Sequence, residues 1–536
     1  MKRSRLLLGG LALGLLSVAF LAGCSSGGFS EKSGKAAANV LRYPIPNNPT
    51  SLDPATVQDG DTLDLLIQVY EGLVGWGSNN EVVGLLAESW EVSPDGLTYT
   101  FKLRDAKFHN GRTVTAEDIK WSIERAADPK MASPTIEAYL SDIKGLSDMV
   151  QGRATSIEGI KVIDEKTVSI TLNDIRPYFL GKLTYLVAAA VPKEIAPMGK
   201  QISSAAEMVG TGPFKMKEWQ DKQLAVLSRN DDYWGGAPKL ETIERPVVLD
   251  ANTRLNLYLS GEVDMIQLQR QDLKGVLDNP EIKDHVVKLD RAAIWYVGMS
   301  QLEYAPFKDK RVRQAFAMAI DRDNIVNVLM GGVNTPAYTI LPPAIPGHRE
   351  KGKGPEYNVE KAKALLAEAG YPGGKGLPPL NMTHREGYPD IKLVAEAVAG
   401  QIKSNLGVDV RVSPQEWGKY LEDYNNKKQV FYHMRWSADF LDPQNFLSHM
   451  LTTTGPENKF GWSNPEFDAL CAKADRILNM EERLPLYAQA EDIALEEAVW
   501  IPIFYQRDIE LHRPGLTGIR KSVFGHLPHT TTEVKR

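Results

Sequence analysis

The period of the hydrophobic pattern changes near Asp290, and this change limits the folds that the chain can adopt. Before that point apolar residues alternate with polar ones, as at Tyr99, Phe101 and Leu103. Alternation with a period of two is typical of a half-buried strand. After that point, segments such as Lys308–Ile320 carry apolar residues at helical spacing between loops rich in proline and glycine. Strands and helices in this arrangement predict an α/β protein that is rich in β-structure near its start.

Three shorter segments carry local structural signals. Apolar residues on one helical face predict a helix over Asp61–Leu73. The pattern Thr115-x-x-Asp118 resembles a capping box and predicts a helix that begins there and ends at Arg125. The sequence VGTGPF at 209–214 lacks the further glycine or lysine of phosphate-binding loops. It predicts a tight crossing of the backbone, for which glycine is suited because it has no Cβ.

The length and charge of the chain narrow its class. It has 536 residues, 43% of them hydrophobic and 24% charged, as in an ordinary globular protein. A single core does not grow to this length, so several domains are expected. The net charge is −6 and the chain contains no long basic run. We therefore expect no nucleic acid among its partners, because such proteins carry a basic patch.

The first residues have the features of an export signal. Basic residues precede a short apolar run that ends in small residues before Cys24. A cysteine in this position is typical of a bacterial lipobox, where it is lipidated and becomes the new N-terminus. We predict a signal peptide over 1–23 and a flexible tether over 24–38. The alternatives are a plain signal peptide with an incidental cysteine and an uncleaved anchor, although the apolar run is short for a spanning helix.

The segment RWSADFLDPQNF at 435–446 gives the strongest indication of a binding site. Trp436 and Phe440 stand on either side of Asp439, next to Ala438. An acid among aromatic side chains is costly to bury unless a partner neutralises it. The ammonium group of a ligand would be such a partner, since charge-assisted hydrogen bonds are strong.

The second acid of this segment, Asp442, suggests a structural role. It stands directly before Pro443, which is the pattern of a helix N-cap followed by proline at the first helical position. A hydrolase could use Asp439 and Asp442 as an acid pair, because glycosidases place two carboxylates across the scissile bond. Two acids three residues apart, one of them a predicted cap, match that requirement poorly.

No catalytic or metal-binding motif is present in the sequence. It contains no Gly-x-Ser-x-Gly elbow, no His-Glu-x-x-His and no Cys-x-x-Cys. His526 and His529 are close together but lie in a polar tail, where we expect solvated side chains. We predict no catalytic residue, no metal ligand and no cofactor, and hence no enzyme.

A group of longer motifs resembles a known family. They are LDP (52–54), LAESWEVSPDGLTYTFKLRDAKFHNGRTVTAEDI (86–119), VGTGPF (209–214), NDDYWGGAPKL (230–240), SGEVD (260–264), PFKDKRVRQAFAMAIDR (306–322), KALLAEAGYP (363–372) and WSNPEFD (462–468). With them the chain resembles the bacterial extracellular solute-binding proteins of family 5, the dipeptide, oligopeptide and nickel group that feeds ABC importers. The stretch ADPKMASPTIEAYL at 127–140 resembles the oligopeptide-binding branch in particular.

The resemblance implies a two-lobed periplasmic-binding-protein type II fold of the α/β class. An extra domain in the first lobe makes three domains, and a hinge joins the lobes. We place domain I at 39–72, 207–290 and 505–536, domain II at 73–206, and domain III, the second lobe, at 291–504. The hinge crossings are expected near Asp290–Met299 and Trp500–Arg507, and members trap the ligand by hinge closure.

The resemblance also implies roles for single residues. In peptide-binding members an Asp after a Trp pairs with the α-ammonium group of the ligand, and this position corresponds to Asp439, with Trp436 beside it. The peptide main chain would be held as an added strand. Arg385 lies near the carboxylate-binding Arg of dipeptide-binding members; the alternative is a surface Arg paired with Glu386. Trp417 is an aromatic residue that could line the cleft; the alternative is an ordinary core Trp.

The implied function is that of a substrate-binding lipoprotein of an ABC importer, which captures peptides, in particular oligopeptides. Its partners would be a peptide, the membrane permease and ATPase complex, and the membrane itself through lipid on Cys24. We expect an exported monomer, lipid-anchored at the outer face of the cytoplasmic membrane or in the periplasm. The alternatives are another solute (an oligosaccharide, a nickel chelate or an opine-like compound), a secreted hydrolase, and a sensor that feeds no transporter.

Overall fold

The computed structural model describes residues 39–536, which form one compact unit. The predicted signal peptide and the whole of the predicted tether, including Cys24, lie outside the described residues. Within 39–536, no helix combines the length and the hydrophobicity that a membrane crossing requires.

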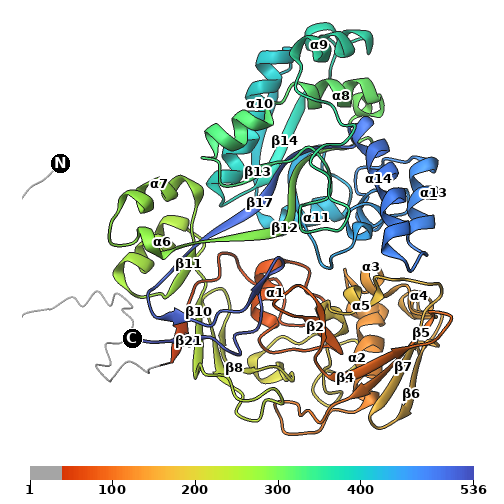
Figure 1. Cartoon of the computed structure of the whole chain (residues 1–536), viewed down its shortest axis with the longest axis vertical. Helices are drawn as coiled ribbons and strands as arrows, with labels where there is room; N and C mark the ends of the chain where they lie inside the picture. The colour runs from red at the N-terminus through yellow and green to blue at the C-terminus, as the bar shows by residue number, and fades with distance from the viewer. Residues whose placement is uncertain (1–38) are drawn as a thin grey trace, which may run out of the picture. The chain divides into compact units, whose positions relative to one another are not determined.

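Strands and helices are mixed along the chain, as the hydrophobic pattern predicts (Figure 1). The α-helices are α1 (Gly60–Leu66), α2 (Ala116–Ala127), α3 (Ile136–Leu140), α4 (Leu146–Val150), α5 (Phe179–Lys182), α6 (Ala251–Ser260), α7 (Arg270–Asp278), α8 (Lys310–Met318), α9 (Val359–Glu368), α10 (Pro389–Leu406), α11 (Trp417–Asn425), α12 (Ser448–Leu451), α13 (Pro465–Ala474) and α14 (Met480–Glu496). Short strand pairs join β2 (Val74–Trp76) to β3 (Val82–Gly84), β18 (Leu516–Thr517) to β21 (Glu533–Val534), and β19 (Lys521–Ser522) to β20 (Gly525–His526).

The first described strand belongs to a four-stranded sheet. Its strands stand in the order β1 (Val40–Arg42), β10 (Thr242–Pro246), β9 (Leu224–Arg229) and β8 (Phe214–Gln220). β1 is parallel to β10, and the other pairs are antiparallel. The glycines of VGTGPF allow the chain to cross close to the backbone of Val69, whose carbonyl accepts from the Gly212 N–H at 2.9 Å. The predicted tight crossing is therefore confirmed.

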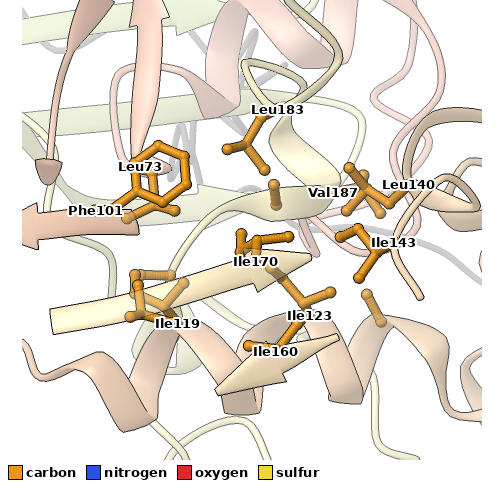
Figure 2. Close-up of a cluster of buried hydrophobic side chains, with 14 of the residues drawn as sticks. Leu73, Phe101, Ile119, Ile123, Leu140, Ile143, Ile160, Ile170, Leu183 and Val187 are labelled. Atoms are coloured by element: carbon orange, nitrogen blue, oxygen red, sulfur yellow. The ribbon is translucent and has the colours of Figure 1, made fainter. Parts of the chain in front are cut away.

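A second four-stranded sheet is antiparallel throughout. Its order is β4 (Ala87–Val92), β5 (Thr98–Leu103), β7 (Thr167–Thr171) and β6 (Ile160–Asp164). Helix α2 packs on this sheet, and the reciprocal capping box of Thr115 and Asp118 fixes its start. Figure 2 shows the core between them, where Phe101 and Ile170 from the sheet meet Ile119 and Ile123 from α2. The capping box and the alternating strand are confirmed.

The largest sheet has seven strands and contains the two longest ones. Its order is β11 (Met265–Gln267), β17 (Trp500–His512), β12 (Val286–Met299), β16 (Phe431–Ser437), β14 (Leu380–Arg385) and β15 (Val410–Gln415), and β13 (Thr335–Pro336) also pairs with β17. β12 pairs with β17 over most of its length, with a register shift between Asp290 and Ile294. Such irregularities bend a ladder locally.

These two long strands divide the described chain into two lobes. We call the chain between the end of β12 and the start of β17 the second lobe, and the described residues before β12 and after β17 the first lobe. Figure 1 shows β12 and β17 running from the body that holds β10 and β11 to the body that holds β14 and α10. The molecule thus has the two-lobed α/β architecture that the resemblance implies. The exact domain limits stay a prediction.

Candidate functional site

A cavity of about 760 Å³ lies between the two lobes. This volume is within the range of small-molecule and cofactor pockets. The first lobe contributes residues from the α1 region and from the segment around Tyr139, and the second lobe contributes the end of β16 and the start of α11. Five residues predicted for the site line it: Arg385, Trp417, Trp436, Ala438 and Asp439.

Asp439 faces a tyrosine from the other lobe. The Tyr139 hydroxyl donates to Oδ2 of Asp439 at 2.7 Å, and the side-chain amide of Asn445 approaches the same oxygen at 3.5 Å. Burial raises the pKa of Asp439 to about 7, although these two hydrogen bonds act in the opposite direction. Among the described residues no cation pairs with this carboxylate, so its ionised form lacks a charged partner in the structure.

Aromatic rings surround this acid. Tyr139 stacks on Tyr185 with ring centroids 3.9 Å apart, and both rings line the cavity. Trp436 donates through Nε1 to Oδ1 of Asn445 at 3.3 Å, which also accepts from the backbone N–H of Asp439 at 3.0 Å. Asn445 therefore fixes Trp436 and Asp439 together. The sequence suggested Trp436 as the neighbour of the acid, but it carried no signal for Asn445 or the tyrosines.

Phe440 is the one residue predicted for the ligand site that does not line the cavity. Its side chain is buried against Gly181 of the first lobe. Its ring stacks on that of Tyr178, also of the first lobe, with the ring centroids 5.9 Å apart. The chain turns sharply after Asp439, so the two neighbours point to different surroundings. Phe440 packs the lobes against each other and does not contact the cavity.

Asp442 has the structural role that its sequence context predicted. Its side chain accepts from the backbone N–H of Gln444 and caps the 3-10 helix Pro443–Asn445. Both carboxylate oxygens also pair with Arg483, each at 2.8 Å. Because Asp442 is held in this buried pair, it does not face Asp439 as the second acid of a hydrolase.

Arg385 and Trp417 meet on another wall of the cavity. The Arg385 guanidinium lies 4.1 Å from the centroid of the Trp417 ring and 4.5 Å from that of Tyr388. One of its nitrogens lies 3.3 Å from Oδ2 of Asp61, which belongs to the first lobe. Arg385 therefore pairs across the cavity with Asp61, where the sequence alternative was a surface pair with Glu386.

Comparison with known proteins places these features in a family. A family model matches residues 81–458, and its description is "Bacterial extracellular solute-binding proteins, family 5 Middle". The chain belongs to this family. Family members are extracytoplasmic substrate-binding proteins, not enzymes. The hydrolase alternative therefore has neither a family precedent nor an acid pair in its favour.

Individual relatives of this family 5 protein cover almost its whole length. It is 31% identical to the dipeptide-binding protein DppE of Bacillus subtilis (strain 168), with 98% of each chain covered. It is 30% identical to the heme-binding protein A of Haemophilus influenzae (strain ATCC 51907 / DSM 11121 / KW20 / Rd), with 94% of this chain and 95% of that protein covered. Relatives at similar identity thus carry names with different ligands.

A solved structure gives information on the arrangement of the lobes. The Escherichia coli murein tripeptide binding protein MppA matches with a TM-score of 0.84 and 27% identity, covering 94% of this chain and 99% of that one. A structure described as the unliganded open form of MppA matches with a TM-score of only 0.69, at 27% identity and covering 93% and 98%. The lobes of this family 5 protein are therefore not arranged as in that open form.

Contacts between the two lobes agree with a closed arrangement. Besides the Tyr139–Asp439 hydrogen bond, Asn47 donates to the Tyr388 hydroxyl at 2.7 Å. Arg476 of the second lobe pairs with Asp174 of the first. Each of these contacts joins residues that an opening of the lobes would separate.

Two arginines on the cavity wall were missed by the sequence analysis. Arg435, on β16, lines the cavity and has no carboxylate partner among the described residues. Its guanidinium makes one long contact, 3.5 Å from Oε1 of Gln506. Burial and the nearby Arg291 lower the pKa of Arg435 below its ordinary value. Arg291 itself lies 3.5 Å from Asp508. An isolated Arg at the end of a strand resembles a surface residue, and only its position beside Trp436 could have drawn attention to it.

Proposed function

We propose that this chain is the extracytoplasmic substrate-binding protein of an ABC importer and that it captures oligopeptides between its lobes. The observation that carries the proposal is the buried carboxylate of Asp439, which faces the cavity and has no cation partner among the described residues. The names of DppE and MppA, a dipeptide-binding and a murein-tripeptide-binding protein, support a peptide as the ligand.

The α-ammonium group of the peptide would pair with Asp439. A charge-assisted hydrogen bond of this kind is strongest where water is excluded, as in a closed cleft. Tyr139 and Asn445 keep the carboxylate oriented toward the cavity. The peptide main chain would add as a strand, so that its backbone supplies affinity and its side chains enter the remaining space.

The carboxylate end of the peptide would contact the basic part of the wall. Arg435 is the best candidate, because in the closed arrangement no carboxylate among the described residues pairs with it directly. Arg385, for which the resemblance implies this role, is paired with Asp61 here. Trp417 stacks on Arg385 and would position it rather than contact the carboxylate directly.

The remaining parts of the proposal concern transport. The long strands β12 and β17 would act as the hinge, with bending at the irregular pairing near Asp290. A lipid on Cys24 would anchor the exported monomer at the outer face of the membrane, where the closed form would deliver its peptide to the permease and ATPase complex. The chain would carry out no catalysis itself.

Native mass spectrometry of the full chain, followed by denaturing release of bound material, tests this proposal. We expect a bound species that is released as peptides with free amino termini. Their lengths and terminal groups would define the ligand class directly.

Other released ligands would overturn the peptide assignment. A sugar, a nickel chelate, an opine-like compound or a haem, together with no binding to a peptide library, would leave only a solute-binding protein of another specificity. A chain that released nothing and bound no library member would argue for a different role, such as a sensor.

A further inference from the structure

Three donor side chains that the peptide proposal does not use meet at the wall of the cavity. Glu510 and His512 come from β17, two residues apart and hence on the same face of the strand, and His526 comes from β20. Nε2 of His512 lies 2.7 Å from the Glu510 carboxylate, and Nε2 of His526 lies 3.1 Å from it. All three sets of donor atoms lie within 4.8 Å of one another.

The cluster is sheltered and still adjacent to the cavity. The side chains of Glu510, His512 and His526 are exposed by only 10%, 12% and 10%. Glu510 and His526 also line the cavity. An approaching ion could therefore reach Glu510 and His526 directly from the cavity.

We propose that Glu510, His512 and His526 form a binding site for a divalent transition-metal ion of the zinc type. Two imidazole nitrogens and one carboxylate are a donor set that Zn²⁺ accepts, and three protein ligands leave a fourth position open. Zinc to nitrogen or oxygen distances near 2.1 Å require donors about 3.4 Å apart in a tetrahedral site. The two carboxylate–imidazole pairs, at 2.7 and 3.1 Å, would therefore need to separate by about 0.7 and 0.3 Å to reach that spacing.

The surroundings of His526 are those of a metal-binding histidine. Its Nδ1 faces Oδ1 of Asp64 at 3.8 Å, while Nε2 points to Glu510. A histidine that binds a metal usually directs its second ring nitrogen at a carboxylate, which sets the orientation of the ring. Asp64 is in turn held by Arg245 at 2.9 Å, so this orientation is fixed by a chain of contacts.

The charges around the cluster allow an added cation. Asp508 precedes Glu510 on the same face of β17 and lies 3.5 Å from Arg291, so these two charges offset each other. Arg245 is likewise offset by Asp64. The Glu510 carboxylate then remains as the net negative group that faces the two imidazoles.

The open coordination position would face the cavity, because Glu510 and His526 border it. A solute carboxylate or a water could complete the site there. The proposal does not depend on peptides as the ligand, since the three donors are present whatever the cleft binds.

Metal titration of the full chain, stripped with a chelator, tests the proposal. Competition with a chromophoric chelator would measure Zn²⁺ affinity, and Co²⁺ would report the ligand geometry through its visible absorption. We expect one ion per chain at this site and a tetrahedral Co²⁺ spectrum. The substitutions Glu510→Gln, His512→Gln and His526→Gln should each weaken Zn²⁺ binding at least tenfold and remove that spectrum.

A matched control is His348→Gln. His348 also has one carboxylate neighbour, Glu350 at 3.9 Å, but no third donor within residues 39–536, so its loss should leave binding unchanged. Absence of binding by the wild-type chain, or binding that all three cluster substitutions leave intact, would show that the cluster is only a buried hydrogen-bonded ion pair. If a variant does not fold, the wild-type Co²⁺ spectrum decides: an octahedral, oxygen-only spectrum or none overturns the proposal.

Discussion

At the scale of single residues, the central feature is the Asp439 carboxylate, which is buried without a cation to pair with it among the described residues. Burial raises the pKa of Asp439 to about 7, and the hydroxyl of Tyr139 and the amide of Asn445 only partly compensate. Binding a cationic group would stabilise the ionised carboxylate, because an opposite charge favours the charged form of an acid. The same residue should therefore control both the affinity for the ligand and its pH dependence.

Replacing Asp439 by Ala should weaken peptide binding by about 2–5 kcal/mol, the usual effect of removing one partner of a buried charge pair. Calorimetry with a peptide identified by release would measure the change. An N-acetylated form of the same peptide provides the control: it should bind weakly to the wild type, and Asp439→Ala should weaken it little further. Equal losses for the free and the acetylated peptide would remove the ammonium contact from the site.

The affinity for a peptide should rise with pH around neutrality. Below pH 7 the Asp439 carboxyl is mostly protonated and must lose its proton when an ammonium binds, whereas above pH 7 it is already ionised. We expect an increase of up to about tenfold per pH unit below the pKa, and then a decline near pH 8, where the peptide α-amino group itself loses its proton. Calorimetry from pH 5 to 8 would test this, with Asp439→Asn as a variant in which the dependence should vanish.

At the scale of structural elements, short capped segments hold the binding residues in place. Asp442 caps the 3-10 helix Pro443–Asn445, and the last residue of that helix, Asn445, orients both Trp436 and Asp439. Arg483 from α14 fixes the cap through two hydrogen bonds. The position of the binding acid thus depends on a buried ion pair that does not contact the cavity.

Removing this cap should destabilise the fold. Asp442→Ala would leave Arg483 buried without its partner, and we expect a loss of about 3–5 kcal/mol in the free energy of unfolding. Denaturant unfolding of the ligand-free chain would measure it. The double variant Asp442→Ala/Arg483→Met should recover part of the loss, since no buried charge remains, and a surface change such as Asp409→Ala should have little effect. A neutral Asp442→Ala variant would contradict this account.

At the scale of the whole described chain, function depends on two lobes that meet over a cavity. Tyr139 and Asp61 of the first lobe contact Asp439 and Arg385 of the second. Both of these contacts are polar, so they can break when the lobes open. The ligand would add to them, which is how a solute stabilises the closed form.

Weakening a contact across the cavity should favour the open form without unfolding either lobe. Asp61→Ala removes the ion-pair partner of Arg385. A partly exposed pair of this kind contributes about 0.2–1 kcal/mol, which here would be lost from the free energy of the closed form. Small-angle X-ray scattering should show a larger radius of gyration for the ligand-free variant than for the wild type. Saturating peptide should bring both to the same value; no difference without ligand would mean that this pair does not contribute to closure.

The sequence by itself determined the parts of this protein that depend on neighbouring residues. The alternation at Tyr99–Leu103, the capping box at Thr115 and the cap at Asp442 are local, and all are present in the structure. The helix predicted over Asp61–Leu73 was too long: α1 ends at Leu66, because the backbone of Gln68 and Val69 pairs with the crossing at 209–214 instead. A distant segment decided that boundary.

Only the tertiary structure decided which residues form the sites. The partner of Asp439 is Tyr139, three hundred positions away in the sequence, and no local pattern connects them. His526 was expected in a solvated tail, but the fold places it against Glu510 of β17 with only a tenth of its side chain exposed. Phe440, next to Asp439 in the chain, does not line the cavity and stacks on Tyr178 instead. Local propensity follows from adjacent residues, whereas burial, pairing and the direction of a side chain after a turn depend on how the whole chain packs.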